Sequence, residues 1–311
     1  MTLSPIIIFV YKRLWHTQQT LEALRNNRLA DKSDLYIYSD YPKDEKAKEG
    51  VKAVRDYLKS INGFKKINTI KRERHFGLAD SIISGVTEVI NKYGKAIVLE
   101  DDLVSSPNFL RFMNEALDFY EEDKRIFSVT GYCYPIEIPT NYKYSVYLYY
   151  RCCSWGWGTW TDRWEKVDWQ VKDYQLFKND QETRKRFNRG GDDLSTLMDF
   201  QMRGKIDSWA IRWCYTLFKN NAYCLYPTVS KIKNIGQDGS GTHFSIRRMT
   251  TTLDKNNENQ VFRKNLQINE EILRNLNRHF RYDLQRKIMH VVQDAIDRIA
   301  LFVLPKAYDT K

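Results

Sequence analysis

Three consecutive acids, Glu100, Asp101 and Asp102, directly follow the apolar run at residues 95–99. Neighbouring carboxylates repel one another, so all three ionise together only when another charge compensates them. A divalent cation would do so, and hard carboxylate oxygens suit Mn²⁺ or Mg²⁺. The alternative is a solvated loop whose charge is balanced by the N-terminus of the next helix. We favour the metal, because the run before the acids is otherwise wholly apolar.

The elements that must position these acids alternate between strand and helix. Strands are predicted at 5–11, 34–40, 67–71 and 95–99, with helices between them. This order implies an α/β fold with a mostly parallel sheet flanked by helices, in which ligands bind at the carboxyl ends of the strands. The acids lie at such an end. A helix is expected directly after them, with Ser106 as its N-cap and Pro107 as its first residue.

Composition narrows the classes of function. The 311 residues are 42% apolar and 14% aromatic, which predicts one sizeable domain with an appendage. The formal charge of +11 indicates an anionic partner, but no zinc-finger spacing or RNP-like motif favours nucleic acid. Without a membrane span or secretion signal, a cytoplasmic location is expected. The five cysteines show no disulfide or metal-binding pattern and are expected to be reduced and packed.

The second half of the chain holds two further candidate regions. Residues 152–169 contain five of the eight tryptophans, which either fill a core corner or offer indole faces to an acceptor sugar. For the second reading the candidates are Trp155 and Trp157. The glycine-rich stretch 234–244 could let the backbone approach phosphates, although it matches neither common phosphate-binding motif.

Near its end the chain repeats apolar residues in steps of three and four, from Ile272 to Ile299. The polar face carries six basic residues: Arg274, Arg278, Arg281, Arg286, Lys287 and Arg298. An amphipathic helix is therefore predicted from about Asn269 to Leu304. We expect it to lie on an anionic membrane surface, while packing on the catalytic domain or in a dimer would explain the same stripe equally well.

In this context "VLEDDLVSSPNFL" resembles the metal-binding acidic motif of GT-A glycosyltransferases, specifically the inverting N-acetylglucosaminyltransferase I type and related bacterial polysaccharide transferases. Five more segments resemble that family in the right order: "FVYKRLWHTQQTLEAL", "YIYSD", "SWGWGTW", "IDSWAIRW" and "PTVSKIKNIGQDGSGTH". The resemblance implies a Rossmann-like GT-A catalytic domain over 1–245. Its nucleotide-binding half would be 1–102 and its acceptor-binding half 103–245, followed by a linker and a basic helical tail over 246–311.

The resemblance also implies roles for single residues. Asp102 would ligate the metal, Asp101 would contact ribose and Glu100 would face the sugar. Asp40 would read uracil and Arg13 would reach the base or the diphosphate. Ser240 and His243 would contact the donor from the glycine-rich loop. Simpler readings stay open, since Asp40 could cap a turn, Arg13 could pair with an acid and His243 could be structural.

An inverting displacement also needs one base on the acceptor hydroxyl. The family's second acid aligns with Ser208, so the role falls on Asp207 only with a shifted alignment, and Asp193 and Asp199 are in reserve. We expect apolar neighbours to raise the pKa of Asp207. The alternative is that Asp207 caps the following helix.

The function implied is transfer of a hexose or N-acetylhexosamine from a UDP-sugar to a glycan or lipid-linked acceptor in surface polysaccharide biosynthesis. The partners would be the donor, the acceptor and the inner membrane face, without nucleic acid. One alternative is a sugar-phosphate nucleotidyltransferase, which should carry a glycine-rich loop after the first strand, where "YKRLWHT" has no glycine. The other is a non-catalytic carbohydrate-binding protein.

Overall fold

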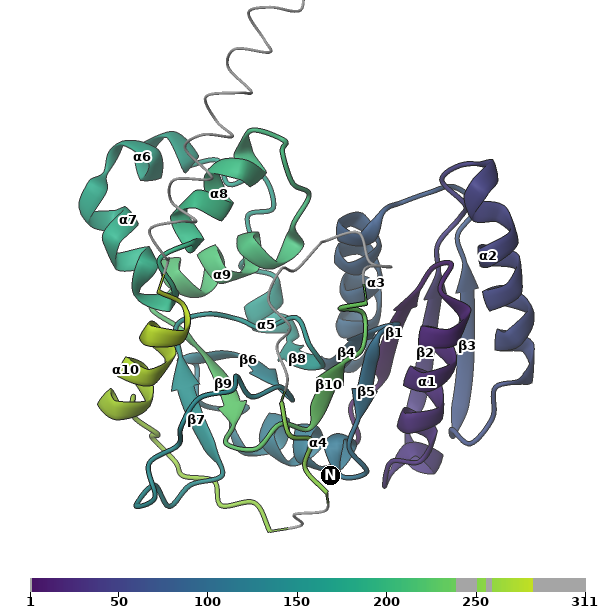
Figure 1. Cartoon of the computed structure of the whole chain (residues 1–311), viewed down its shortest axis with the longest axis horizontal. Helices are drawn as coiled ribbons and strands as arrows, with labels where there is room; N and C mark the ends of the chain where they lie inside the picture. Colours follow the sequence, from purple (N-terminus) through teal and green to yellow (C-terminus); the bar gives the residue numbers. More distant parts are fainter. Residues whose placement is uncertain (1, 239–250, 256–258, 282–311) are drawn as a thin grey trace, which may run out of the picture.

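The computed structural model describes residues 2–238, 251–255 and 259–281 (Figure 1). Within these residues, eight strands form one sheet in the order β3-β2-β1-β4-β8-β6-β9-β7. Their bounds are β1 Ile6–Val10, β2 Asp34–Ser39, β3 Lys66–Lys71, β4 Lys95–Glu100, β6 Ile126–Thr130, β7 Val146–Tyr149, β8 Trp157–Trp160 and β9 Tyr223–Pro227.

The half of the sheet that carries the acids is parallel. Strand β1 pairs with both β2 and β4, and β2 pairs with β3. The crossovers contain α1 (Leu14–Arg25), α2 (Glu45–Tyr57) and α3 (Leu78–Tyr93). Gly94 ends α3 in the left-handed conformation, with φ 82°, and the chain enters β4 at the next residue. The predicted α/β fold is confirmed, because apolar strands such as β1 are buried on both faces between helices.

The other half of the sheet is mixed. Strand β8 runs antiparallel to both β4 and β6, β9 is parallel to β6, and β7 is antiparallel to β9. Helices α6 to α9 gather over one end of this half (Figure 1). The helices of this half are α4 Phe109–Phe119, α5 Thr161–Trp164, α6 Tyr174–Asn179, α7 Gln181–Phe187, α8 Leu194–Met202 and α9 Trp209–Lys219.

A separate two-stranded sheet places the acidic loop beside the start of the glycine-rich stretch. Strand β5 (Leu103–Ser105) pairs antiparallel with β10 (Ile232–Asn234). The expected helix start at Ser106 and Pro107 is wrong, because α4 begins at Phe109 and Asn108 precedes it. Ser106 instead continues the pairing of β5 with the β10 segment, because its backbone N–H donates to the Lys231 carbonyl at 2.8 Å.

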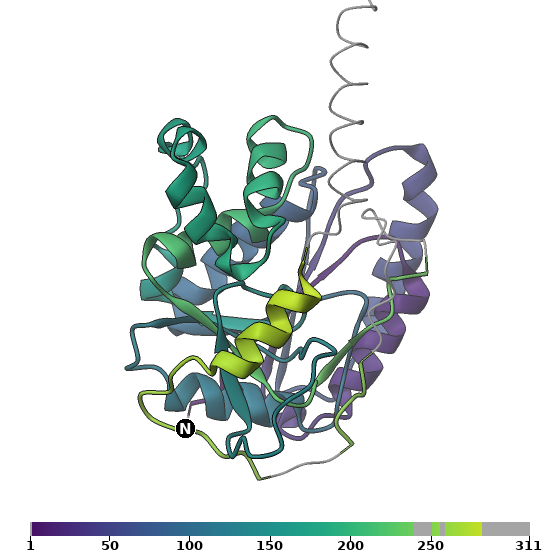
Figure 2. The ribbon, with the colours of Figure 1, turned by 60° about the vertical axis from the view of Figure 1, so that its left-hand side comes forward.

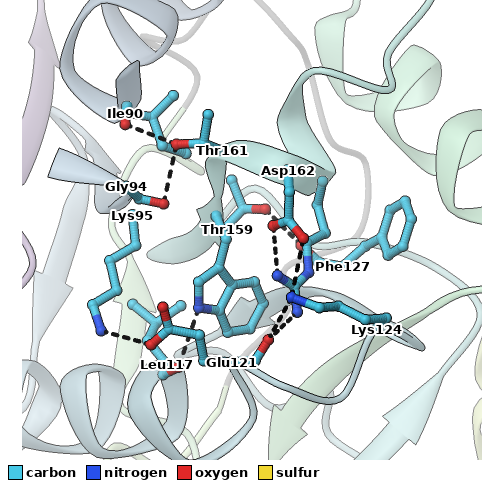
Figure 3. Close-up of polar contacts among 12 residues, drawn as sticks. Ile90, Gly94, Lys95, Leu117, Glu121, Lys124, Phe127, Thr159, Thr161 and Asp162 are labelled. Atoms are coloured by element: carbon cyan, nitrogen blue, oxygen red, sulfur yellow. Dashed lines mark hydrogen bonds and ion pairs between the residues drawn. The ribbon is translucent and has the colours of Figure 1, made fainter. Parts of the chain in front are cut away.

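Polar contacts hold β8 beside the start of β4, which is the end of that strand farther from the acids (Figure 3). The Thr161 hydroxyl donates to the carbonyls of Ile90 and Gly94, at 2.8 and 3.1 Å, where α3 ends. The Thr159 hydroxyl donates to the Phe127 carbonyl at 2.6 Å. Lys95, the first residue of β4, forms ion pairs with acids of the α4 region. These contacts fix the start of strand β4. The three acids lie at its other end.

The last described helix, α10 (Glu270–His279), packs on the rest of the chain (Figure 2). Ile272 and Leu276 are buried, and Phe280 lies edge-on to Tyr134 with ring centroids 4.7 Å apart. Up to residue 281, the expectation of a membrane-facing stripe is wrong, because the stripe is covered by this chain's own core. The remainder of the predicted helix lies outside the described residues. Among the described helices, none is long and apolar enough to cross a membrane.

Candidate active site

Arg13, Asp101 and Asp102 meet where β1 and β4 end. These neighbouring strands are parallel, so residues just beyond them lie at the same edge of the sheet. The Arg13 guanidinium donates to both carboxylates: Nη2 lies 2.8 Å from Asp102 Oδ2 and also bonds Asp101 Oδ1. The Thr20 hydroxyl, from α1, donates to the Asp101 carbonyl at 2.8 Å. An arginine therefore compensates two of the three acids in this structure.

The charges of this group are strongly coupled. Burial opposes the charge on Arg13, but the hydrogen bonds and charges of Asp101 and Asp102 outweigh it and raise the pKa of Arg13. Burial raises the pKa of Asp101, against the lowering effect of Arg13. Burial, together with the charges of Asp102 and Asp101, raises the pKa of Glu100 to about 8. Perturbations of this kind are common at functional sites.

Glu100 lies on a different side of the sheet edge from the Arg13 contacts. As the last residue of β4 it shares a face with Ala96 and Val98, because side chains alternate along a strand. That face belongs to the core cluster shared with α3, Trp157 and Trp209. Glu100 therefore faces the helical half of the molecule.

Residues 234–238, the described part of the glycine-rich stretch, lie directly beside the acids. The Ile235 backbone N–H donates to the Asp102 carbonyl at 2.9 Å, and His16 Nε2 of α1 lies 3.1 Å from Asp238 Oδ2. A Cβ added to Gly236 would stand 2.0 Å from Asp102 Oδ2. Sequence reasoning missed His16 and the need for glycine at 236, since both depend on the β5–β10 pairing, which has no periodic signal in the sequence.

These residues fit a diphosphate and a divalent cation. Arg13 Nη1 is buried without a hydrogen-bond partner among the described residues, so it has a donor to offer an anion. No three-residue metal cluster occurs in 2–238, 251–255 or 259–281. Mg²⁺ and similar ions are often held by one or two carboxylates plus substrate phosphates, so Asp102 could complete such a site only together with a bound diphosphate.

Asp40, which the resemblance assigned to uracil, accepts hydrogen bonds from the protein backbone. Its Oδ1 accepts the backbone N–H groups of Tyr41 and Phe76, at 2.8 and 2.9 Å. Its Oδ2 accepts the Gly77 N–H at 3.0 Å and lies 2.8 Å from His75 Nδ1. A carboxylate offers about four lone-pair sites, and three of them accept backbone N–H groups here. Asp40 therefore clamps the loop before α3, and its predicted contact with uracil is not carried into the proposed function.

A pocket of about 350 Å³ lies beside that clamped loop. It is lined by Arg74, His75, Phe76, Asp80, Ile83 and Ser84. Two of these residues, His75 and Phe76, are the ones that contact Asp40. Asp40 therefore holds two of the residues that line this pocket.

The candidate bases do not have the environment expected for them. Asp207 is 65% exposed and lies 3.1 Å from Arg212, and Ser208, not Asp207, caps α9. The expected apolar setting for Asp207 is therefore wrong, because its side chain turns outward from the helix start. Asp193 and Asp199 are held in two-point ion pairs by Arg151 and Arg184.

The two candidate tryptophans differ. Trp157 is 1% exposed and stacks on Trp209 with ring centroids 4.8 Å apart. The prediction that Trp157 binds the acceptor sugar is therefore wrong, because its indole is buried in the core. Trp155 is partly buried, and its ring lies edge-on to Tyr132 at 4.5 Å. Because Trp157 pairs with Val98 across β8 and β4, Trp155 lies on the Glu100 side of that pair. Ser240 and His243 lie outside the described residues.

Comparisons with known proteins give distant likenesses only. No protein-family model and no curated sequence matches the chain. TarS from S. aureus, residues 1–349, has a TM-score of 0.42 and 9% identity, covering 73% of this chain and 59% of that one. PcManGT, a mannosyltransferase from Pyrobaculum calidifontis in complex with GDP-Man and Mn²⁺, has a TM-score of 0.40 and 10% identity, covering 70% and 69%.

A UDP-glucose pyrophosphorylase complexed with UDP-glucose has a TM-score of 0.31 and 10% identity, covering 53% of this chain and 79% of that one. The chain spans about three-fifths of the TarS fragment. Scores this low do not choose among the activities of these proteins. The function is therefore argued from the residues of the site.

Proposed function

We propose that this chain is an inverting, metal-dependent glycosyltransferase that moves a hexose or N-acetylhexosamine from a UDP-sugar to a glycan or lipid-linked acceptor. The observation that carries the proposal is the group of Arg13, Asp101 and Asp102 at the carboxyl edge of parallel strands, with a buried, unpartnered arginine nitrogen. Such a group suits a substrate that brings both phosphate oxygens and a cation.

On the donor side, each residue has a distinct task. Arg13 binds the diphosphate through Nη1, which has no other partner among the described residues. Asp102 would hold Mn²⁺ or Mg²⁺ jointly with the diphosphate, and the cation would supply charge stabilisation for the UDP leaving group. Asp101, pinned by Arg13 and by Thr20 through its backbone, contacts the ribose. The nucleoside base enters the pocket beside His75 and Phe76.

On the acceptor side, Glu100 and Trp155 face the helical half of the molecule. Trp155 offers its exposed indole surface to the acceptor sugar. Asp207 remains the proposed base because it is open to solvent at the start of α9, while Asp193 and Asp199 are both committed to arginines. In a single displacement it would take the proton of the attacking hydroxyl as UDP leaves from the opposite face.

The proposal also covers the setting of the reaction. The acceptor would be a component of surface polysaccharide, and the donor would be cytoplasmic. Any contact with the inner membrane face is assigned to residues beyond 281, because Ile272 and Leu276 are already buried in the core.

Thermal stabilisation by UDP, with and without Mn²⁺, tests the central claim. We expect Asp102→Asn to abolish the part of the stabilisation that needs Mn²⁺, since the amide lacks the charge that holds the cation. Asp56→Asn is the matched control, because Asp56 lies on the exposed face of α2 and pairs only with nearby lysines. Equal Mn²⁺-dependent stabilisation of the Asp102→Asn protein and the parent would contradict the metal-ligand role.

A panel of UDP-sugars separates the proposal from its alternatives. A transferase without its acceptor should release UDP slowly from one donor, and Mn²⁺ should be required. A nucleotidyltransferase should instead release pyrophosphate from UTP and a sugar 1-phosphate. A carbohydrate-binding protein should bind glycans and give neither product.

A further inference from the structure

Cys152 and Cys214 bring their sulfur atoms together inside the protein. The two Sγ atoms are 2.8 Å apart, and the Cys152 backbone N–H donates to Cys214 Sγ at 3.3 Å. A disulfide bond is roughly 2.05 Å long, so a small approach of the two sulfurs would join them. One cysteine lies in the loop before β8 and the other lies within α9, 62 residues further along the chain.

This sulfur contact is specific to one pair. All five cysteines are free and buried. The Cys133 thiol lies near the Tyr147 hydroxyl, at 3.7 Å, and the Cys224 thiol points at the Leu225 carbonyl, at 3.8 Å. Cys153 is adjacent to Cys152 in sequence, so it provides a matched control for any chemistry at the pair.

The surroundings favour a thiolate on one member of the pair. Burial opposes a charge on Cys214, but the hydrogen bond from Cys152 and the nearby Arg151 guanidinium outweigh it and lower the pKa of Cys214. Burial raises the pKa of Cys152. Since the thiolate is the nucleophile in disulfide exchange, Cys214 would react first.

We infer that Cys152 and Cys214 are a reversible disulfide site that exchanges with a low-molecular-weight disulfide such as oxidised glutathione. The Cys214 thiolate attacks one glutathione sulfur, which releases the first glutathione as its thiolate and leaves a mixed disulfide. The Cys152 sulfur then attacks the Cys214 sulfur, and the second glutathione leaves. The two protons lost by the protein end on the released glutathione thiols, and the glutathione disulfide is reduced.

This bond would join two segments of the proposed acceptor side, although the inference does not depend on the proposed function. It would close a loop that contains β8 and helices α5 to α8. It would also tie the segment that carries Trp155 to the helix that begins just after Asp207. Cross-linking residues so far apart in sequence restricts the unfolded chain, so the oxidised protein should be the more stable form.

Refolding in glutathione buffers tests the site without requiring access to buried thiols. The full chain is unfolded and reduced, refolded at a series of reduced-to-oxidised glutathione ratios, alkylated and mapped by mass spectrometry. We expect one intramolecular cross-link, between Cys152 and Cys214, with three alkylated cysteines remaining. The Tm of this form should exceed that of the reduced protein by at least about 5 °C, and dithiothreitol should reverse the increase.

Single variants decide which sulfurs are responsible. Cys214→Ser and Cys152→Ser should lose the cross-link and the redox-dependent increase in Tm, whereas Cys153→Ser and Cys224→Ser should retain both. If a variant fails to refold, the map of the parent protein still decides. Cross-links scattered among all five cysteines, or five free thiols at every ratio that allows refolding, would overturn the inference.

Discussion

Replacing Gly236 with alanine should disable the donor site without unfolding the protein. A Cβ at this position would stand 2.0 Å from Asp102 Oδ2, 2.8 Å from Asp102 Cγ and 3.0 Å from Arg13 Nη1. The carboxylate and residue 236 must therefore separate by about 1 Å, a displacement that can cost on the order of 100-fold in rate when it occurs at a reacting site.

The separation can occur in two ways, and each damages the site. Asp102 can turn away from Arg13, which loses a charge-assisted hydrogen bond worth about 1.5–3 kcal/mol. Alternatively, the backbone at 235–238 can lift, which loses the bond from the Ile235 N–H to Asp102 and the contact between His16 and Asp238. We therefore expect UDP with Mn²⁺ to bind at least about 10-fold more weakly.

The assay is Mn²⁺-dependent stabilisation by UDP together with the rate of UDP release from the preferred UDP-sugar. Gly204→Ala is the control, because Gly204 has a φ of 68° and nothing within 4 Å of an added Cβ. It introduces backbone strain of about 1–2 kcal/mol in the connection between α8 and α9, without contact with the acids. Parental UDP binding and turnover by the Gly236→Ala protein would refute the claim that Gly236 is packed against a working site.

Three further predictions address the reassigned residues. Asp40→Asn should lower the free energy of unfolding by about 2–3 kcal/mol, because an amide cannot accept all of the backbone N–H groups. Its preference for UDP over CDP should not change. Loss of that preference with an unchanged Tm would restore Asp40 as the residue that recognises the base. Asp207→Asn should reduce transfer at least ~100-fold with unchanged UDP-sugar binding and Tm, and near-parental transfer would remove Asp207 as the base. Trp157→Ala should destabilise the fold by about 3–5 kcal/mol, whereas Trp155→Ala should mainly raise the KM for acceptor; the opposite pattern in denaturant unfolding and kinetics would reverse the two roles.

The sequence predicted the parallel half of the sheet well and the mixed half poorly. Strands such as β1 and β4 are apolar runs buried on both faces and separated by whole helices, so local patterns define them. Residues 126–150 have a strand-like, aromatic pattern, yet only 126–130 and 146–149 of them are strands. The pairing of β8 between β4 and β6 joins segments that are distant in sequence, and short strands with bulky aromatics carry no period that specifies such partners.

The same distinction applies to the site. The acids were placed correctly because they end a parallel strand, a rule that needs only the strand assignments. Arg13 was assigned from the resemblance to GT-A glycosyltransferases, and the strand pattern alone did not single it out. Asp40 also lies at a strand end, but its partners are backbone N–H groups of residues 76 and 77, which no side-chain pattern reveals. The outward turn of Asp207 depends on which residue begins α9, because Ser208 is the partly buried cap of that helix, whereas the side chain of Asp207, one residue earlier, is exposed.

Arg13 also determines how donor and cation must depend on each other. In this structure its guanidinium donates to Asp102 Oδ2, so under the proposed function Arg13 and the cation would compete for that oxygen. Arg13 is mostly buried, and weakening its contact with a carboxylate is costly unless a new anion replaces it. A diphosphate would be such an anion, and its contact with Arg13 would leave Asp102 free to bind the cation that neutralises both. The two ligands should therefore bind together far more strongly than either binds alone, a coupling that follows from one arginine shared between two carboxylates.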